Sequence, residues 1–243
     1  MIERLKLFQE KAVAYLDKVR IKMNNKYDGV ALVDFCGTLV SVQTADLFVH
    51  FTIRKNLIKR IRYYILYLYQ KVSIKTKTNF LKLTLDKRLF LKFLKGYTKQ
   101  QIEISSQKFA KMIFDKYLYG ETISSLKKLD NKNIIIISAG YKSYIDEFCK
   151  LIDINIDKVY ASDFLYENDI FTGRIDRTCY GDDKVKILEE NNELEGYSKS
   201  QIYVFTDSSS DLPIVDLGKN VYCINPDSKL LKLAKINDWI IIK

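Results

Sequence analysis

The chain has 243 residues, 47% of them hydrophobic, and a formal net charge of +10. This composition is typical of a globular protein with a large core, and it excludes a disordered or low-complexity chain. The cysteines form no Cys-x-x-Cys pair and His50 is the only histidine, so zinc fingers, disulfide frameworks and His-based triads are excluded. We expect reduced thiols and a cytoplasmic location.

The first segment, residues 1–26, is predicted to form an amphipathic helix. Its apolar residues recur at helical spacing. Acidic residues interrupt them, which argues against a secretory signal peptide. We expect this helix to pack on the core or on a second copy of the chain.

A short apolar run comes next and ends in an acidic residue. Residues 30–33 are continuously apolar, which is typical of a strand buried on both faces of a parallel sheet. Asp34 follows, and then come Cys36, Gly37 and Thr38. A carboxylate can act as a nucleophile in phosphoryl transfer. A glycine lets the backbone pass close to a phosphate.

Most of the positive charge lies in the segment from Phe51 to Gly120, which holds 17 Lys or Arg and 3 Asp or Glu. Helical patterns cover this segment, and Thr98 with Gln101 three residues later predicts a capped helix start. The helices are expected at Asp46–Ile53, Asn56–Val72, Thr78–Gly96 and Lys99–Tyr119, the first of them capped from within Ser41 to Thr44.

Three interpretations of this basic segment stay open. It forms a solvated surface, it attracts an anionic phosphorylated substrate, or it docks on anionic lipid. The stretch Ile61–Tyr69 is apolar and rich in tyrosine, with basic residues before it, which suits a membrane interface. It is shorter than the roughly 20 apolar residues that a spanning helix needs. Nucleic acid is disfavoured because no recognition motif accompanies the charge.

Two more buried strands are predicted at Ile134–Ile137 and Ile202–Phe205, and polar residues follow both. Ser138 follows the first strand, and Thr206 with Asp207 follows the second. The remaining strands are expected at Lys158–Ala161, Val221–Ile224 and Trp239–Ile242, with a hairpin near Phe164–Ile175. Together these elements predict an α/β fold with a doubly wound parallel sheet, which binds ligands beyond the carboxyl ends of its strands.

The polar residues at these strand ends suit phosphoryl transfer with Mg²⁺. Asp34 is the candidate nucleophile, while Lys184 and the Ser138 hydroxyl would neutralise the phosphoryl oxygens. Asp34 and Asp207 are oxygen ligands of the kind Mg²⁺ prefers, with Asp211 acting through water or on Lys184. Each motif alone has an ordinary explanation as a turn or helix cap. Their order and placement together favour function.

These motifs resemble those of the haloacid dehalogenase-like hydrolase superfamily, closest to the branch with phosphoserine phosphatases and a helical cap. Residues 34–39 resemble its first motif, usually Asp-x-Asp-Gly-Thr, and Ser138 resembles the second. Lys184 resembles the third-motif lysine, and residues 206–213 resemble the fourth motif. Residues 171–175 also resemble the hairpin that precedes this lysine, so the resemblance covers about residues 30–226.

The resemblance implies a Rossmann-type catalytic core at residues 27–41 and 119–243, with a helical cap inserted at residues 42–118. It also implies Mg²⁺-dependent phosphatase chemistry, with catalytic roles for Asp34, Cys36, Ser138 and Lys184. The implied metal ligands are Asp34, the Cys36 backbone carbonyl, Asp207 and Asp211, and the implied phosphate-binding residues are Gly37, Thr38, Ser138, Ala139, Gly140 and Lys184.

Cys36 departs from the family pattern, because the family's phosphatases carry an Asp there that protonates the leaving oxygen and activates water. A neutral thiol is a poor base for water, although a free cysteine also fills a buried gap well. Three functions therefore stay open. The chain is a phosphomonoester phosphatase, a phosphate-ligand-binding or slow phosphotransfer protein, or a membrane-surface phosphatase of lipid phosphate. The expected partner is a phosphorylated small molecule or lipid headgroup, with peripheral contact to an anionic membrane in the third case.

Overall fold

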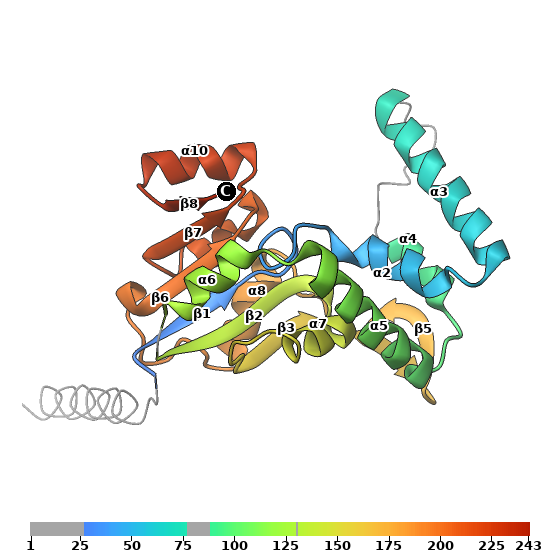
Figure 1. Cartoon of the computed structure of the whole chain (residues 1–243), viewed down its shortest axis with the longest axis horizontal. Coiled ribbons are helices and arrows are strands. Elements are labelled where there is room, and N and C mark those ends of the chain that lie inside the picture. The colour runs from blue at the N-terminus through green and yellow to red at the C-terminus, as the bar shows by residue number, and fades with distance from the viewer. Residues whose placement is uncertain (1–26, 77–87, 130) are drawn as a thin grey trace, which may run out of the picture.

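The computed structural model describes residues 27–76, 88–129 and 131–243 (Figure 1). The amphipathic helix predicted for residues 1–26 lies outside the described residues. The first part of the helix predicted near Thr78–Gly96 also lies outside them.

A six-stranded parallel sheet forms the centre of the molecule. Its strands are β1 Gly29–Val33, β2 Lys132–Tyr141, β3 Lys158–Ser162, β6 Ile202–Thr206, β7 Asn220–Ile224 and β8 Ile240–Ile242. Their order is β3-β2-β1-β6-β7-β8, so the chain winds outward from β1 first in one direction and later in the other. This arrangement confirms the predicted doubly wound α/β fold.

The second strand is longer than predicted. The sequence predicted a strand that ends near Ser138, but β2 continues to Tyr141 and α7, Lys142–Cys149, begins after it. The pairing with β3 shifts between Ser138 and Tyr141. The Tyr141 N–H donates to the Tyr144 hydroxyl at 3.0 Å, which anchors the first turn of α7 at this later position.

Helices cover both faces of the sheet, which explains why the strand sequences are apolar without alternation. Ala31 and Val33 of β1 belong to the hydrophobic cluster under α6, Gly120–Lys127, and α7. Val30 and Leu32 belong to the cluster on the opposite face. The helices over that second face are α8 Asp182–Glu190, α9 Leu212–Val215 and α10 Ser228–Ile236.

A helical segment is inserted between β1 and β2, where the family resemblance implies a cap. Its elements are α2 Thr44–Ile53, α3 Leu57–Thr76, α4 Arg88–Leu91, the short 3-10 helix η1 Lys92–Leu94, and α5 Lys99–Tyr117. In Figure 1 these helices extend from the end of the molecule opposite β7, β8 and α10, and α3 projects farthest.

Both predicted helix starts in this segment are confirmed, but only one of them has a side-chain cap. Thr98 accepts a hydrogen bond from the Gln101 N–H at 3.1 Å, and the Gln101 side chain accepts from the Thr98 N–H, as in a capping box. The residue before α2 is Gln43, and its side chain makes no capping bond. The Thr44 hydroxyl does not cap α2 because it bonds side chains in the core instead.

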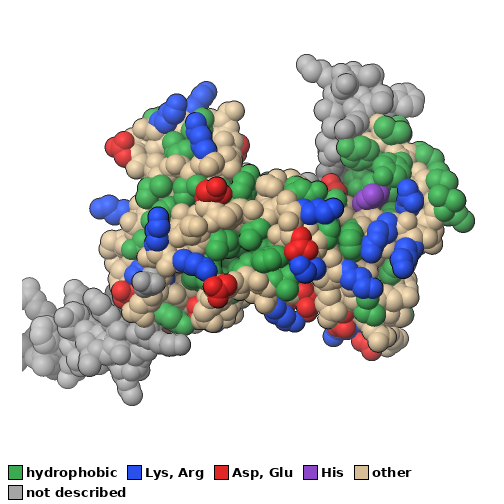
Figure 2. All heavy atoms as spheres, in the orientation of Figure 1, with side chains coloured by type: hydrophobic (Ala, Val, Ile, Leu, Met, Phe, Trp, Pro, Cys, Tyr) green, Lys and Arg blue, Asp and Glu red, His purple; other side chains and the backbone are tan. Residues whose placement is uncertain are grey.

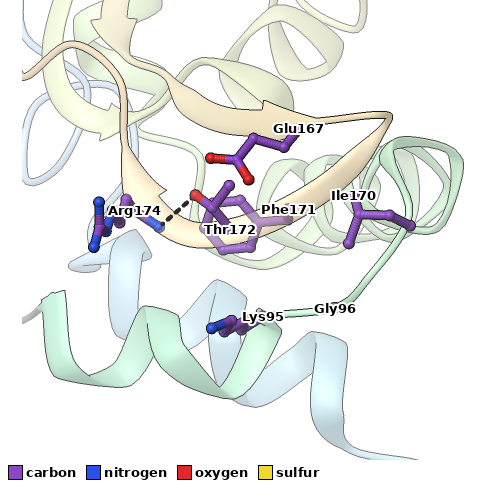
Figure 3. Close-up of a pocket in the computed structure, with 7 residues that line it drawn as sticks. All are labelled: Lys95, Gly96, Glu167, Ile170, Phe171, Thr172 and Arg174. Atoms are coloured by element: carbon purple, nitrogen blue, oxygen red, sulfur yellow. Dashed lines mark hydrogen bonds between the residues drawn. The ribbon is translucent and has the colours of Figure 1, made fainter.

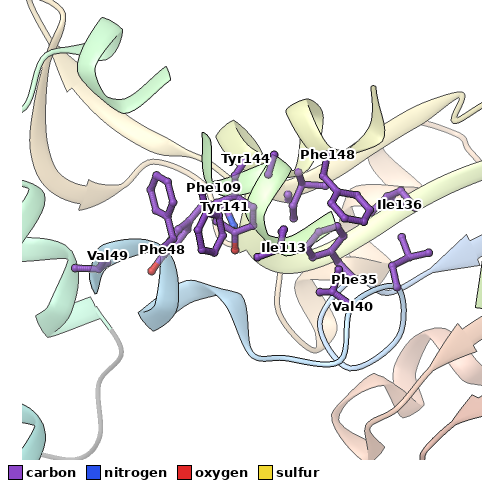
Figure 4. Packing of buried hydrophobic residues seen from close by; sticks show 14 of the residues in the cluster. Phe35, Val40, Phe48, Val49, Phe109, Ile113, Ile136, Tyr141, Tyr144 and Phe148 are labelled. Atoms are coloured by element: carbon purple, nitrogen blue, oxygen red, sulfur yellow. The ribbon is translucent and has the colours of Figure 1, made fainter. Parts of the chain in front are cut away.

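Aromatic side chains join the inserted helices to the sheet domain (Figure 4). The ring of Phe48 in α2 lies 5.2 Å from that of Phe109 in α5 and 5.1 Å from that of Tyr144 in α7, between centroids. The Phe35 ring, just after β1, lies 5.0 Å from the Phe148 ring. The two parts of the chain therefore share one hydrophobic cluster.

The predicted hairpin is confirmed as the antiparallel pair β4 Phe164–Glu167 and β5 Ile170–Ile175. Backbone bonds tie it to the inserted segment, since Phe171 N–H donates to the Tyr97 carbonyl and Gly96 N–H donates to the Phe171 carbonyl. Two further 3-10 helices are η2 Lys199–Gln201 and η3 Ser209–Asp211. Among the helices that the structure describes, none is both long enough and apolar enough to cross a membrane.

Candidate active site

The carboxyl ends of β1 and β6 bring Asp34 and Asp207 to one edge of the sheet. The two strands pair directly, with Val33 beside Phe205, and the Asp34 N–H donates to the Phe205 carbonyl at 2.9 Å. The strand order reverses here, because β2 lies on one side of β1 and β6 lies on the other. Such a reversal opens a crevice in which α/β sheets bind ligands.

Lys184, near the start of α8, connects two carboxylates of this edge. Its Nζ donates to Asp34 Oδ1 at 2.9 Å and to Asp211 Oδ1 at 2.7 Å, and all three side chains are buried. The other Asp211 oxygen, Oδ2, accepts from Thr206 Oγ1 at 2.8 Å. Of the two roles expected for Asp211, the structure shows the contact with Lys184. An ammonium has three N–H donors, so one remains for a ligand.

Burial and mutual repulsion perturb these groups. Burial raises the pKa of the Asp34 carboxyl to about 6, and the charge of Lys184 limits that rise. Burial, followed by the charge of Asp34, raises the pKa of the Asp207 carboxyl to about 7. Burial alone would lower the pKa of Lys184, but Asp34 and Asp211 raise it above the ordinary lysine value. Three carboxyls around one ammonium make a site that favours a cation.

Gly37 brings the backbone of the first loop against Asp207. Its φ is +79°, a conformation that residues with a side chain rarely adopt. A Cβ at this position would lie 2.0 Å from Asp207 Oδ2. Only glycine therefore allows this close approach between the loop after β1 and the carboxylate after β6.

The predicted phosphate-binding hydroxyls belong to Ser138 of β2 and to Thr38 in the loop after β1, and they make no direct bond to Lys184, Asp34 or Asp211. Ser138 Oγ is buried and accepts from the Gly140 N–H at 3.1 Å, so the 138–140 segment is locally ordered. Thr38 Oγ1 is also buried, and it has no hydrogen-bond partner among the residues described. Both hydroxyls retain a hydrogen that a phosphate oxygen could accept.

Cys36 is held by a chain of buried hydroxyl groups. Its Sγ lies 2.9 Å from Thr44 Oγ1, which lies 2.6 Å from the Tyr144 hydroxyl. The Tyr144 hydroxyl in turn accepts from the Tyr141 N–H. Burial, followed by the charge of Asp34, raises the pKa of the Cys36 thiol to about 11. The thiol is therefore neutral near pH 7, and its position is set by Thr44.

The donor set fits a hard divalent cation that is completed by its substrate. Among residues 27–76, 88–129 and 131–243, no three side chains of His, Cys, Asp or Glu form a ready-made metal cluster. Mg²⁺ does not need one, because it is commonly held by one or two carboxylates together with substrate phosphate and water. Asp34 and Asp207 supply such a pair, and the tight loop at Gly37 keeps the backbone beside Asp207.

A separate cavity of about 320 Å³ lies between the β4–β5 hairpin and the loop after η1 (Figure 3). None of the predicted site residues lines it. Basic and acidic side chains share its walls, with Arg174 and Glu167 on the hairpin and Lys95 on the loop after η1. The full lining is Lys95, Gly96, Glu167, Ile170, Phe171, Thr172 and Arg174.

Sequence reasoning missed Thr44 and Tyr144, which position Cys36. Thr44 was considered only as part of a helix cap, and Tyr144 was not singled out. The contact between the two joins residues 100 positions apart, so no local spacing signals it. Thr206 was noted as part of the fourth motif, but its bond to Asp211 was not foreseen.

A family model described as haloacid dehalogenase-like hydrolase matches residues 31–216. Curated relatives are 25% identical over 47% to 61% of the chain, and one of them is a probable phosphatase of Mycobacterium tuberculosis, matched over 115 residues. The match spans only 39% of the length of the probable phosphatase and 54% of the length of the relative matched over 61% of this chain.

Solved structures show the same fold. A protein of unknown function from Bordetella pertussis Tohama I superposes with a TM-score of 0.71 at 15% identity, over 88% of this chain and 97% of that one. A phosphoserine phosphatase with an analogue of its phospho-aspartyl intermediate superposes with a TM-score of 0.55 at 16% identity, over 88% and 92%. At these identities the likeness concerns the fold alone.

Proposed function

Because the chain belongs to the haloacid dehalogenase-like hydrolases, we propose that it hydrolyses a phosphomonoester through an aspartyl-phosphate on Asp34. The observation that carries this proposal is the buried Lys184 ammonium between Asp34 and Asp211. It fixes a carboxylate at the carboxyl edge of the sheet and keeps a positive charge beside the place where a phosphoryl group would be transferred. Positioning and charge stabilisation supply most of the catalysis in such transfers.

In the first step, an Asp34 carboxylate oxygen attacks the phosphorus, and the bond from phosphorus to the leaving oxygen breaks. The leaving alcohol needs a proton, and the neutral Cys36 thiol is the group that we place there as its donor. In the second step, water attacks the phosphorus of the aspartyl-phosphate and gives a proton to the thiolate that the first step left on Cys36. The bond to Asp34 breaks, which frees inorganic phosphate and regenerates the carboxylate.

Several residues would hold the transferred group. Lys184 has one N–H beyond its two carboxylate bonds, and the buried hydroxyls of Thr38 and Ser138 can each donate. We also place the backbone of Ala139 and Gly140 in this role. Converging donors of this kind stabilise the charge on the equatorial phosphoryl oxygens.

Asp34, Asp207 and the Cys36 backbone carbonyl would hold Mg²⁺. Bound there, the ion would neutralise charge on the phosphate and on the two carboxylates whose pKa values are raised. Asp211 is engaged by Lys184 and Thr206, so we assign it to positioning Lys184, with at most a water-mediated role at the metal.

Cys36 favours a second candidate function, in which Asp34 is phosphorylated but loses its phosphate slowly. A raised pKa keeps the thiol protonated and makes it a weak acid. If the thiolate formed in the first step regains a proton as the alcohol leaves, the neutral thiol that results cannot activate water. The chain would then act as a slow phosphotransfer or phosphate-binding protein. Stoichiometric labelling of Asp34 without turnover would identify this case.

The substrate proposed is a phosphorylated small molecule or a lipid headgroup phosphate. The inserted helices stand where the cap of this family lies, and their excess of basic residues would attract an anionic substrate. Closure of such a cap excludes water and selects the substrate.

The test is phosphate release from a panel of sugar, amino-alcohol, nucleotide and lipid phosphomonoesters, with Mg²⁺ and with EDTA. Asp34→Asn is the matched variant, because it keeps the size of the side chain and removes the nucleophilic carboxylate. We expect metal-dependent release by the natural chain and a loss of about 10⁴-fold or more in the variant, the scale on which covalent nucleophiles act. Equal release by both proteins would overturn the proposal.

A further inference from the structure

The outward face of α3 is an apolar stripe that no other described element covers. Leu57 is 65% exposed, Ile58 is 71% exposed and Ile65 is 63% exposed. Soluble proteins rarely leave several large aliphatic side chains together in water, and such surfaces mark sites of interaction. The exposed members of the stripe are Leu57, Ile58, Ile61, Ile65, Leu68 and Tyr69, and Tyr64 at its margin contacts His50 of α2.

The stripe follows from the helical period. At about 100° per residue, Leu57, Ile61 and Leu68 point in nearly the same direction, and Ile65 lies beside them. Tyr63 projects from the opposite side and is buried, with its ring 4.8 Å from that of Phe90 between centroids. One side of α3 thus packs on the inserted segment, and the other is left for a partner.

Arginines border the stripe on both sides. Arg60 and Arg62 fall on opposite edges of it by the same helical period, and both are exposed. The basic residue on the packed side, Lys59, is instead held by a bond from its Nζ to the Phe93 carbonyl at 2.9 Å. The outward face therefore combines an apolar centre with cationic margins.

Basic residues predominate in the sequence around the stripe. The α3 sequence contains no acidic residue, and the segment from Phe51 to Gly120 holds 17 basic and 3 acidic residues. Figure 2 shows hydrophobic side chains gathered along α3, with Lys and Arg next to them. An excess of this kind attracts a partner with a dense negative charge.

The apolar surface continues past the start of α3. A second hollow of about 630 Å³ is lined by Leu57 and Ile58 of α3, by Tyr97, and by Ile104 of α5, which is 45% exposed. Lys55 stands at its edge. The surface thus extends across two helices, which is more than one amphipathic turn would present.

We propose that α3 docks on an anionic lipid bilayer, with its apolar stripe in the headgroup region and Arg60 and Arg62 on the lipid phosphates. An aliphatic stripe with tyrosines and basic margins is the pattern of helices that lie in a membrane interface. Arginine side chains bury their stems in such a boundary and keep the charge at the headgroups. The stripe argues against nucleic acid as the partner, because aliphatic side chains gain little on a phosphate backbone.

This inference is independent of the proposed phosphatase activity, and its test does not measure turnover. The full chain is sedimented with vesicles of phosphatidylcholine alone and with vesicles of phosphatidylcholine mixed with phosphatidylglycerol. We expect binding to the anionic vesicles only, weakened by salt. Ile61→Asp with Ile65→Asp should weaken binding about tenfold or more, because two buried aliphatic side chains are lost. Arg60→Glu with Arg62→Glu should have an effect of similar size.

Matched controls come from α10, at the other end of the molecule. Ile236 is 75% exposed, so Ile236→Asp adds charge to an aliphatic site outside the proposed surface and is the control for the isoleucine changes. Lys232→Glu with Lys235→Glu reverses two exposed charges and is the control for the arginine changes. The reversal in α10 should change binding far less than the reversal in α3. All four variants change exposed residues, and circular dichroism verifies that they are folded.

Three results would overturn the proposal. The first is that the natural chain does not bind anionic vesicles. The second is that the α3 and α10 variants lose vesicle binding equally. The third is that Ile61→Asp with Ile65→Asp leaves binding unchanged, which would mean charge attraction without insertion. Size-exclusion chromatography is run in parallel. A dimer that Ile61→Asp with Ile65→Asp dissociates, without vesicle binding by the natural chain, would show that the stripe binds a second copy instead.

Discussion

Charged side chains are placed in opposite ways in two regions of this molecule. At the sheet edge, Lys184 is buried between Asp34 and Asp211, and its two N–H bonds fix both carboxylates. On α3, Arg60 and Arg62 stand exposed beside aliphatic side chains. Buried charge must be paired within the fold. Exposed charge of one sign is available to a partner, so the comparison separates groups that hold the site together from groups that meet the outside.

Removal of the buried ammonium should have the largest effect. Lys184→Met leaves Asp34 and Asp211 buried without their counter-charge, and we expect a loss of about 3–5 kcal/mol in the free energy of unfolding. Urea unfolding monitored by circular dichroism, in EDTA, measures it.

The matched control is Lys127→Met, which breaks the exposed pair between Lys127 and Asp153 at 2.7 Å. Exposed pairs contribute about 1 kcal/mol or less. If both substitutions cost the same, the buried network does not stabilise the fold in the way described here.

Magnesium should stabilise the protein through the same edge. A ligand present at 100 times its Kd adds about 2.7 kcal/mol to the free energy of unfolding, so we expect Mg²⁺ to raise the melting temperature. Asp207→Asn should abolish this rise. Gly37→Ala should abolish it too, because its Cβ would fall 2.0 Å from Asp207 Oδ2.

Gly96→Ala is the control for backbone strain. Gly96 has a φ of +86°, close to that of Gly37, but a Cβ there meets nothing within 4 Å. Both alanine variants are expected to lose about 1–2 kcal/mol from the left-handed conformation. Only Gly37→Ala should also lose the response to Mg²⁺. Loss of the response in both would mean that strain, rather than contact with Asp207, disrupts the site.

The fold was predictable from the sequence because each central strand is a continuous apolar run bounded by polar residues. Both faces of these strands are buried, as the runs indicated. The end of β2 was missed because the bond between Tyr141 and Tyr144 moves the helix start. The Thr44 hydroxyl was expected near a helix cap, but contacts with Cys36 and Tyr144 engage it instead.

The candidate site was only partly predictable, because contacts between distant parts of the chain leave no local pattern in the sequence. Asp34, Lys184 and Asp211 could be grouped because strand ends and motif order are visible in the sequence. The approach of Gly37 to Asp207 depends on how two loops meet across the sheet. For α3, the sequence raised a membrane interface as one interpretation, but it did not predict which side of the helix is exposed, because the stretch is apolar on nearly all sides.

Cys36→Asp is expected to have a smaller effect, which is to raise turnover about tenfold. The carboxylate would accept from Thr44 in place of the thiol contact at 2.9 Å, and it would restore a group able to activate water. Steady-state phosphate release measures the change, with Cys149→Ser as a control remote from the proposed chemistry. A lower rate in Cys36→Asp would show that the thiol is part of a tuned mechanism.

The smallest predicted effect tests whether the inserted helices and the sheet unfold together. Thr98 caps α5, and Thr98→Ala should cost about 1 kcal/mol, whereas Thr98→Ser should cost little. The Phe109 ring of α5 lies 5.0 Å from the Tyr144 ring of α7, so α5 shares the core cluster.

We therefore expect Thr98→Ala to shift one cooperative urea transition, seen equally by circular dichroism and by the fluorescence of Trp239 near β8. If circular dichroism moved while the Trp239 signal stayed in place, the inserted helices would unfold separately from the sheet. In that case α3 could change its packing on a membrane without disturbing Asp34 and Lys184. A single shifted transition would instead mean that docking through α3 and the geometry of the sheet edge are mechanically linked through the aromatic cluster around Phe48 and Phe109.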